Sequence, residues 1–434
     1  MPSDLAQHIG QLKVMDTHEH MCKEPDWVGD QRDVLALLIN NYHERDLRTG
    51  GASNEAIQRA LDPSDPDVEG RFAGIEKAWA AGRFTGYSEA VSLVAKEVFG
   101  IDRINPQTLR AAQPQIDALR QPGRRLHILR DLAGLDHIQT DDFCWQCMPD
   151  ESGSDFFLYD LGWRDFCNGL VHVDQLARET GVTVGDLASL GQAMAGLFDK
   201  YGPCAIAVKS QHAYDRTLRW IERSDDDAER ALQAVLKDGK DADEQARLCL
   251  GDWGTARGAQ LAGEHHLPFK LHTGYYSGNN YMITDRIGPG NLCPLLVRYP
   301  DTRFVLMHIS YPYYEELIAI AKHFVNAWAD MCWAWSINPL AGARFVRSFI
   351  HAAPINKLFA FGGDTFTPTS AYAYAIQMRR HLTDALEAEI QDGYLSESQA
   401  MQIASRITRD NQIACFDLEG TRAAIQEAVA TVSA

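Results

Sequence analysis

Short runs of apolar residues alternate along the chain with longer stretches whose apolar positions recur every three or four residues. These are the periodicities of strands and of helices, respectively. Eight runs are predicted as strands: 13–18, 135–143, 156–161, 204–209, 268–272, 303–308, 330–336 and 358–364. Regular alternation of strands and helices predicts a parallel sheet, and runs that are apolar on both faces fit a sheet buried between layers.

Five of the predicted strands end in a polar residue that could take part in chemistry: His18, Lys209, His272, His308 and Asp364. In an eight-stranded (β/α) barrel the carboxyl ends of all strands meet at one mouth, where active sites form. An open doubly wound sheet would spread the same residues along an edge. A polar residue ends many strands, but five metal-capable types favour convergence. We therefore predict an α/β fold built as a (β/α)8 TIM barrel.

The segment from about 25 to 130 is too long for one crossover between the first two strands. Its apolar residues have helical spacing and are punctuated by Gly and Pro, so we expect a helical insertion over the barrel mouth, as a lid or pocket wall. The end of the chain has the pattern of closing helices. Without internal repeats, we expect a single domain over 1–434. The run 330–336 places Trp333 and Trp335 on the seventh strand, as pocket wall or as core.

The formal net charge of −18 argues against a nucleic-acid surface, because phosphate binding needs clustered Lys and Arg. The first residues lack a secretory pattern, and no apolar run approaches the roughly 18 residues of a membrane span. We therefore expect a cytoplasmic protein that binds neither nucleic acid nor membrane. Nine Cys are scattered, and Cys144 and Cys147 lack the second pair of a zinc knuckle, so free thiols are expected.

The stretch "LKVMDTHEHM" ends an apolar run at Asp16 and then sets His18 and His20 two residues apart. On a strand, such side chains point to the same side, about 6.5–7 Å apart along the chain. Two imidazoles so placed can bind one metal ion, although a solvated loop would look the same in isolation. With the other strand-end residues they form a nitrogen and oxygen ligand set suited to Zn²⁺, Mn²⁺ or Fe²⁺.

This ordered set resembles the amidohydrolase superfamily: His-x-His after strand 1, Lys or Glu after strand 4, His after strands 5 and 6, and Asp after strand 8. The surrounding stretches look like its amidohydrolase-related subgroup: "AVKSQHAYDRTL", "FKLHTGYYSGNN", "FVLMHISYPYYEE" and "FAFGGDTFTPTSAYAYA". That subgroup includes metal-dependent hydrolase domains fused to some glutamine-synthetase-type proteins, and uronate isomerases are more distant relatives. The resemblance covers roughly 10–24 and 135–420.

The resemblance implies a role for each matched residue. His18 and His20 match the first metal pair, and His272 matches a further ligand. Asp364 matches the aspartate that binds or borders the metal and takes a proton from the attacking water. His308 matches a position that either completes a second metal site or orients the substrate. We expect one tightly held divalent ion, most simply Zn²⁺, with a second site open.

Lys209 is ambiguous in this comparison. In relatives with two metals a carboxylated lysine bridges them, whereas in relatives with one metal the position is free for substrate. The stretch "KSQHAYDR" also offers His212, Tyr214 and Arg216 as anchors for an anionic substrate, and Tyr275 is a further candidate substrate contact.

The leading hypothesis is metal-assisted hydrolysis of an amide-like or related C–N bond in a small, carboxylated molecule. An alternative is a decarboxylase or a uronate-isomerase-like enzyme on the same barrel. A third is a non-catalytic, metal-bound scaffold domain. The expected partners are a small-molecule substrate and further copies of the chain, as a homo-oligomer. Fold membership alone does not decide among the reactions.

Overall fold

The computed structural model describes residues 2–39, 42–278 and 281–433. Its centre is one eight-stranded sheet in which neighbouring strands are parallel and follow the order of the chain. The strands are β1 (Val14–Glu19), β2 (Leu135–Thr140), β3 (Phe157–Gly162), β4 (Ala205–Ser210), β5 (Phe269–Leu271), β6 (Phe304–Leu306), β7 (Ala327–Asp330) and β8 (Leu358–Phe359).

The sheet curls into a barrel because the segment after β8 returns to β1. The Thr17 N–H donates to the Phe361 carbonyl at 3.1 Å, and the Asp364 N–H donates to the His18 carbonyl at 2.9 Å. Inside the barrel, Lys270 Nζ lies 2.8 Å from Asp160 Oδ1, and both side chains are fully buried. The predicted (β/α)8 barrel is confirmed.

The seventh strand differs from the prediction. It covers Ala327–Asp330 rather than 330–336, and the second half of the predicted run forms helix α18 (Ala334–Ile337). The chain leaves the strand because Trp333 takes a left-handed φ of 63° and the Cys332 N–H donates to Asp330 Oδ1 at 2.9 Å. The apolar run continues through this turn because Trp333 is buried there, so apolar character alone misplaced the strand.

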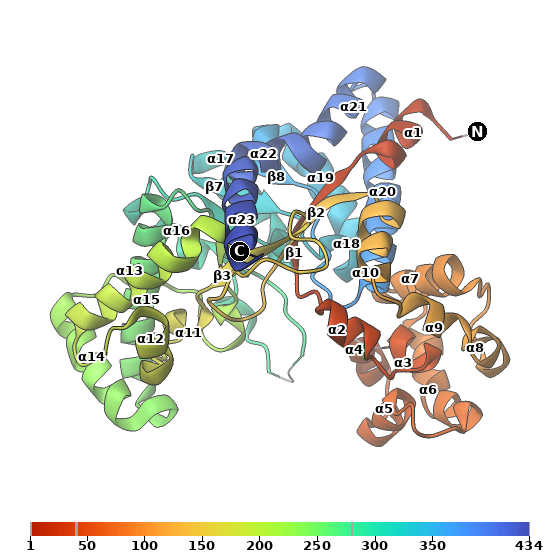
Figure 1. Cartoon of the computed structure of the whole chain (residues 1–434). Coiled ribbons are helices and arrows are strands. Elements are labelled where there is room, and N and C mark those ends of the chain that lie inside the picture. The colour runs from red at the N-terminus through yellow and green to blue at the C-terminus, as the bar shows by residue number, and fades with distance from the viewer. Residues whose placement is uncertain (1, 40–41, 279–280, 434) are drawn as a thin grey trace.

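The chain between β1 and β2 is almost entirely helical, in short segments: α2 (Glu24–Val28), α3 (Val34–Ile39), α4 (His43–Thr49), α5 (Asn54–Leu61), α6 (Val68–Gly82), α7 (Gly86–Leu93), α8 (Pro106–Ala112), α9 (Gln115–Leu119) and α10 (Arg124–Leu126). Ser53, Thr85 and Asn105 each accept a backbone N–H at a helix start, as capping residues do. These helices form a lobe on one side of the barrel (Figure 1).

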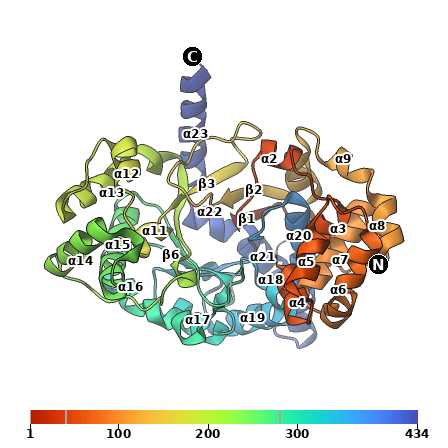
Figure 2. The same ribbon diagram turned by 90° about the horizontal axis from the view of Figure 1, so that it is seen from below.

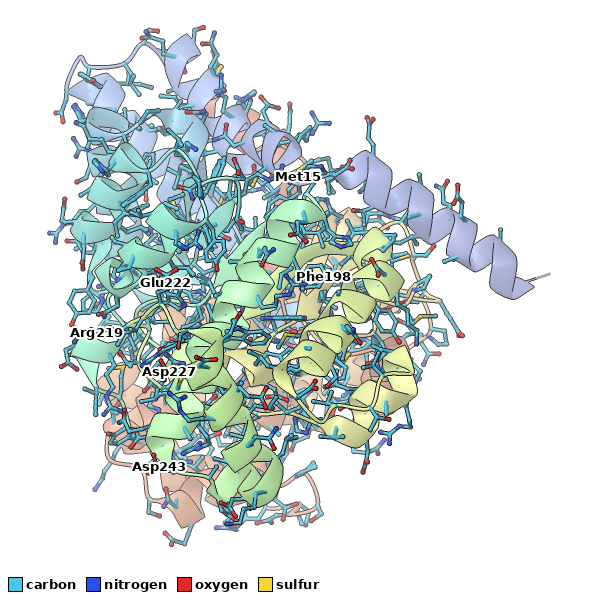
Figure 3. The ribbon with its side chains drawn as sticks, turned by 90° about the vertical axis from the view of Figure 1, so that its left-hand side faces the viewer. Met15, Phe198, Arg219, Glu222, Asp227 and Asp243 are labelled. Atoms are coloured by element: carbon cyan, nitrogen blue, oxygen red, sulfur yellow. The ribbon has the colours of Figure 1, made fainter. Side chains whose placement is uncertain are left out.

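The crossover helices after β3 surround the rest of the barrel: α11 (Arg164–Cys167), α12 (Val173–Thr180), α13 (Leu187–Tyr201), α14 (Asp225–Asp238), α15 (Glu244–Glu264), α16 (Cys293–Arg298), α17 (Tyr314–His323), α18 and α19 (Pro339–Ala352). Helices α12 to α15 and the insertion lie on opposite sides of the barrel (Figure 2). Asp227 and Asp243 are exposed near the starts of α14 and α15 (Figure 3). The acidic stretch around them is therefore an outer, solvated surface.

Helices at both ends of the chain complete the fold: α1 (Asp4–Gln11), α20 (Pro368–Gln391), α21 (Glu397–Ser405), α22 (Asn411–Cys415) and α23 (Leu418–Ser433). Asn411 Nδ2 donates to the Leu358 carbonyl at 2.8 Å, and the Thr421 hydroxyl lies 3.4 Å from the Ala205 carbonyl. Leu358 and Ala205 begin their strands, so α22 and the start of α23 cover the end of the barrel opposite the mouth. Within the described ranges, no helix is both long and apolar enough to cross a membrane.

Candidate metal centre

Three side chains meet where β1 and β8 end. His18 is the fifth residue of β1, His20 follows that strand, and Asp364 lies in the turn after β8. The two Nε2 atoms are 3.3 Å apart, and Asp364 Oδ1 lies 3.4 Å from that of His18 and 3.5 Å from that of His20. All three donor atoms face one point.

These distances fit a metal ion. Around a tetrahedral zinc ion with bonds of about 2.0–2.1 Å, neighbouring ligand atoms stand about 3.3–3.4 Å apart. Two imidazole nitrogens and one carboxylate oxygen thus occupy three corners of such a tetrahedron. His308, Cys332 and Asp364 form a second group with donor atoms within 4.8 Å of one another, and the buried His308 Nε2 has no hydrogen-bond partner among the described residues.

The backbone sets the tautomers of these histidines. His20 Nδ1 donates to the Asp141 carbonyl at 2.8 Å, and His308 Nδ1 donates to the Cys332 carbonyl at 3.0 Å. With the proton on Nδ1, Nε2 keeps its lone pair, as a metal-binding histidine requires. Burial, reinforced by the Lys209 charge, holds the pKa of His18 well below its ordinary value, so this imidazole is neutral as well.

Asp364 is held in a strained turn. Its φ is 53°, and its side chain is buried between the barrel and the histidines. Glycine at the preceding position leaves room for a buried carboxyl group, because a Cβ on Gly363 would lie 2.0 Å from Glu19 Oε1 and would force that side chain to move. Burial alone would raise the pKa of the Asp364 carboxyl, but the hydrogen bond from His18 and the nearby histidines outweigh it. The pKa lies well below its usual range, and the carboxylate is ionised.

Lys209 and His308 border the three ligands. Lys209 Nζ is 3.2 Å from His18 Nε2, and His308 Nε2 is 3.8 Å from Asp364 Oδ2. His308 begins a run of three left-handed residues, with φ values of 64°, 46° and 51°. Such strain in non-glycine residues clusters at functional sites, and here the strained turn fixes the orientation of the His308 ring.

His272 has a different environment from the predicted one. Its Nε2 lies 3.2 Å from the Tyr275 carbonyl, and its ring packs 4.3 Å from that of His308. It lines the pocket, but the structure does not bring it into the group formed by His18, His20 and Asp364. Its assignment as a fourth ligand stays a prediction.

The predicted substrate contacts are dispersed. Tyr214 lines the pocket above the ligands, with its ring 4.9 Å from that of His272. His212 is buried, with Nδ1 2.8 Å from the Ser210 hydroxyl. Arg216 is bound by the Asp252 carboxylate and by backbone carbonyls. Neither His212 nor Arg216 lines the pocket, because each is occupied elsewhere.

The Tyr275 ring also points away from the pocket lining. It packs 5.6 Å from Trp333, which in turn lies 4.2 Å from Tyr42. These aromatic rings form a wall behind the histidines. Trp333, which the sequence left as either pocket wall or core, is buried in this wall and does not belong to a strand.

The pocket over the ligands has a volume of about 410 Å³. Eight residues that line it have no role in the sequence analysis: Ser277 and Gly278 from the loop after β5, and Tyr42, Glu44, Phe143, Arg164, Gln211 and Phe366. Four of them lie just after a predicted or observed strand, a position that could have flagged them. Tyr42 and Glu44 come from the insertion, where no pattern distinguished them.

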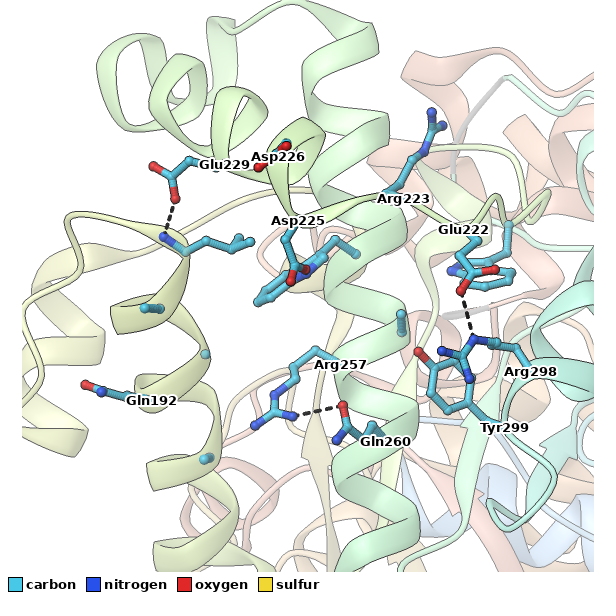
Figure 4. A pocket seen from close by; sticks show the side chains of 17 residues that line it. Gln192, Glu222, Arg223, Asp225, Asp226, Glu229, Arg257, Gln260, Arg298 and Tyr299 are labelled. Carbon is cyan, nitrogen blue, oxygen red and sulfur yellow. Dashed lines mark hydrogen bonds and ion pairs between the residues drawn. The ribbon is translucent and has the colours of Figure 1, made fainter.

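A larger hollow of about 790 Å³ lies elsewhere, between α13, α14 and α15 (Figure 4). Several of its charged side chains already have partners: Arg298 pairs with Glu222 at 2.8 Å, and Arg257 Nη1 donates to Gln260 Oε1 at 2.9 Å. None of the predicted metal ligands lines it. The smaller pocket at the barrel mouth is therefore the candidate site.

Comparison with known proteins points to one family. Residues 195–397, just under half of the chain, match the family model described as Amidohydrolase. Protein fluG of Emericella nidulans is 26% identical over 226 residues, which cover 50% of this chain and 26% of fluG. The chain thus matches about a quarter of the length of that curated relative.

Solved structures share the fold of this chain over nearly its whole length. Uronate isomerase of Thermotoga maritima has a TM-score of 0.77 at 14% identity, covering 95% of this chain and 96% of its own. Glucuronate isomerase of Caulobacter crescentus has a TM-score of 0.77 at 18% identity, covering 96% of each chain. A Lactobacillus casei protein proposed to be a metal-dependent hydrolase has a TM-score of 0.67 at 15% identity, with 96% and 99% covered. At these identities the likeness is one of fold.

Proposed function

We propose that this protein is a metal-dependent hydrolase of the amidohydrolase superfamily that cleaves an amide-like or related C–N bond of a small, carboxylated molecule. The observation that carries the proposal is the triangle of His18, His20 and Asp364, whose donor atoms stand 3.3–3.5 Å apart below an open pocket. Zn²⁺ suits two imidazoles and a carboxylate best, with Mn²⁺ or Fe²⁺ as alternatives. One ion per chain satisfies the triangle, and Lys209 and His308 border the place for a second.

A divalent ion bound there supplies a water of pKa about 7 and polarises the scissile carbonyl. Asp364 is ionised and stands beside the ligands, so it can take the proton of the attacking water and return it to the leaving nitrogen. His308 keeps its proton on Nδ1, which is bonded to Cys332, so its Nε2 can only accept a hydrogen bond. It therefore positions the water or a substrate N–H and does not act as the acid.

Two other classes are compatible with the same barrel: a decarboxylase or uronate-isomerase-like enzyme, and a non-catalytic metal-bound scaffold. The intact group of metal-capable side chains speaks against the scaffold. The likeness to uronate isomerases is one of fold and does not favour isomerisation over hydrolysis.

The test uses the metal-loaded full chain and a panel of N-acyl amino acids in H₂¹⁸O. Hydrolysis would place one ¹⁸O atom in the released carboxylate, as measured by mass spectrometry, and His20→Ala should abolish the labelled product. Unlabelled product with CO₂, or an isomer of equal mass formed from a uronate, would refute hydrolysis in favour of the other enzyme class.

A further inference from the structure

A second, smaller recess adjoins the metal pocket. It has a volume of about 210 Å³ and lies beside the loop after β2 and the start of α11. Three side chains, Phe143, Arg164 and Gln211, line both the recess and the metal pocket. They form the partition between them, so a substrate that reaches past the metal must contact these side chains.

Gln211 has a buried acceptor that none of the described residues uses. The side chain is only 4% exposed, and its Nε2 donates to Asp141 Oδ2 at 3.1 Å. Because a carboxylate oxygen accepts, this bond fixes which end of the amide is the nitrogen. Its Oε1 has no hydrogen-bond partner among the described residues. A buried carbonyl oxygen left unpaired is costly, which points to an N–H or O–H group of a ligand.

The Arg164 guanidinium is held by a carboxylate along one of its edges. Its Nε donates to Asp215 Oδ2 at 2.9 Å and its Nη2 to Asp215 Oδ1 at 3.0 Å. Asp215 also accepts from Asn168 Nδ2 at 2.7 Å, so the carboxylate itself is held in place. This side-on pair uses Nε and Nη2 and leaves Nη1 without a hydrogen-bond partner among the described residues. A carboxylate is the group that arginine recognises best.

Phe143 supplies the apolar part of the partition. It is 52% exposed and adopts a left-handed φ of 57°, which for a non-glycine residue stores strain. The strained turn holds the ring in a parallel stack with His20, with centroids 4.4 Å apart. Phe366, 42% exposed, stacks on the same imidazole at 5.4 Å. The pocket rim therefore offers aromatic faces to an apolar, planar group.

We propose that Arg164 and Gln211 are the specificity-determining residues of the site: Arg164 binds a substrate carboxylate, and Gln211 Oε1 accepts a hydrogen bond from an N–H of the same molecule. The inference rests on the proposed hydrolase function and narrows its substrates to N-acyl amino acids with an aromatic acyl group, which the Phe143 and Phe366 rings contact.

The test measures binding of two matched probes to the zinc-loaded full chain by isothermal titration calorimetry. Hippurate (N-benzoylglycine) has the aromatic group, the amide and the carboxylate, and N-benzoylglycinamide lacks only the charge. The wild-type chain should bind hippurate about 10- to 100-fold more tightly than the amide, as expected for a charge-assisted hydrogen bond. Arg164→Met should abolish this preference, and Arg164→Lys should restore part of it.

Gln211→Leu should weaken both probes by a similar factor, roughly 5- to 10-fold, because both carry the N–H that Oε1 accepts. Metal content and thermal midpoint are measured for every variant, since Asp141 links Gln211 to His20. Arg298→Met is the matched control: Arg298 is also paired with a carboxylate, Glu222, but lines the separate outer groove in Figure 4. It should leave both affinities unchanged.

Equal affinity of the wild-type chain for the two probes, or no binding of hippurate at millimolar concentration, would overturn the inference. So would a preference that survives in Arg164→Met. The binding measurements do not depend on turnover. A preference for hippurate without ¹⁸O incorporation would refute the proposed hydrolase function and leave the proposed binding site standing. Hydrolysis without a preference for hippurate would refute the binding site and leave the hydrolase function standing.

Discussion

Acid should destabilise this protein through one buried histidine of the insertion. His43 begins α4, is only 3% exposed and stands next to the pocket residue Tyr42. The Ser88 hydroxyl donates to the Gly82 carbonyl at 2.8 Å, so at 3.1 Å it can only accept from His43 Nε2. Nδ1 of this tautomer is buried and has no partner among the described residues, so a second proton would find no acceptor.

Burial lowers the pKa of His43 from 6.5 to about 4. The unfolded chain takes up a proton near pH 6.5, whereas the folded chain resists protonation until about pH 4. The stability due to the neutral side chain is therefore complete above pH 6.5 and is lost as the pH falls towards 4. At about 1.4 kcal/mol per pKa unit, the loss amounts to about 3 kcal/mol.

The assay is urea unfolding at a series of pH values between 7.5 and 4.5, with wild type compared with His43→Gln. Glutamine can still donate to Ser88 but does not titrate, so most of the loss of about 3 kcal/mol should disappear from the variant's pH profile. His323→Gln, which removes an exposed histidine near the end of α17, should keep the wild-type profile. Parallel profiles for wild type and His43→Gln would refute the reasoning.

Three further predictions concern the metal centre. Replacing His18 and His20 with Ala should remove the single divalent ion, measured by inductively coupled plasma mass spectrometry; full occupancy would contradict the assignment. Asp364→Asn should retain part of the metal but lower turnover by roughly 10²–10⁴-fold, the usual cost of losing general acid–base catalysis; unchanged turnover would exclude this base. Added bicarbonate should leave the metal content unchanged if Lys209 stays a free amine, whereas a rise would indicate a carbamate bridging two ions.

The barrel and the core of the metal centre could be predicted because both follow from local pattern. Parallel strands produce apolar runs at regular spacing, and metal chemistry requires His and Asp at their carboxyl ends. The seventh strand was misplaced because Trp333 is buried by tertiary contacts with Tyr42 and Tyr275 and so looks like strand sequence. Apolar residues indicate burial in any secondary structure. The strand ends before the backbone turn at Trp333, and the apolar pattern does not show that turn.

Two of the predicted substrate contacts, His212 and Arg216, lie outside the pocket for another reason. Arg216 looked available for an anion, but Asp252, 36 positions further along, already binds it. The sequence did not single out Gln211, and only the hydrogen bond from its Nε2 to Asp141 shows that its Oε1 has no hydrogen-bond partner among the described residues. Whether a polar side chain is free to bind a ligand depends on its hydrogen-bond partners in the fold. Those partners are distant in sequence, so the spacing of residues along the chain does not reveal them.

The candidate metal ligands and the partition residues are held in different ways, which indicates how substrate preference could change while the metal site is kept. The imidazole nitrogens proposed to bind the metal and Asp364, the proposed base, are positioned by the barrel strands and by backbone carbonyls such as that of Asp141. By contrast, two of the partition residues lie outside the sheet: Phe143 is in the loop after β2, and Arg164 is the first residue of α11. Substitutions there can alter which molecule fits the pocket while His18, His20 and Asp364 keep their positions, because neither residue belongs to the strands and turns that carry those three side chains.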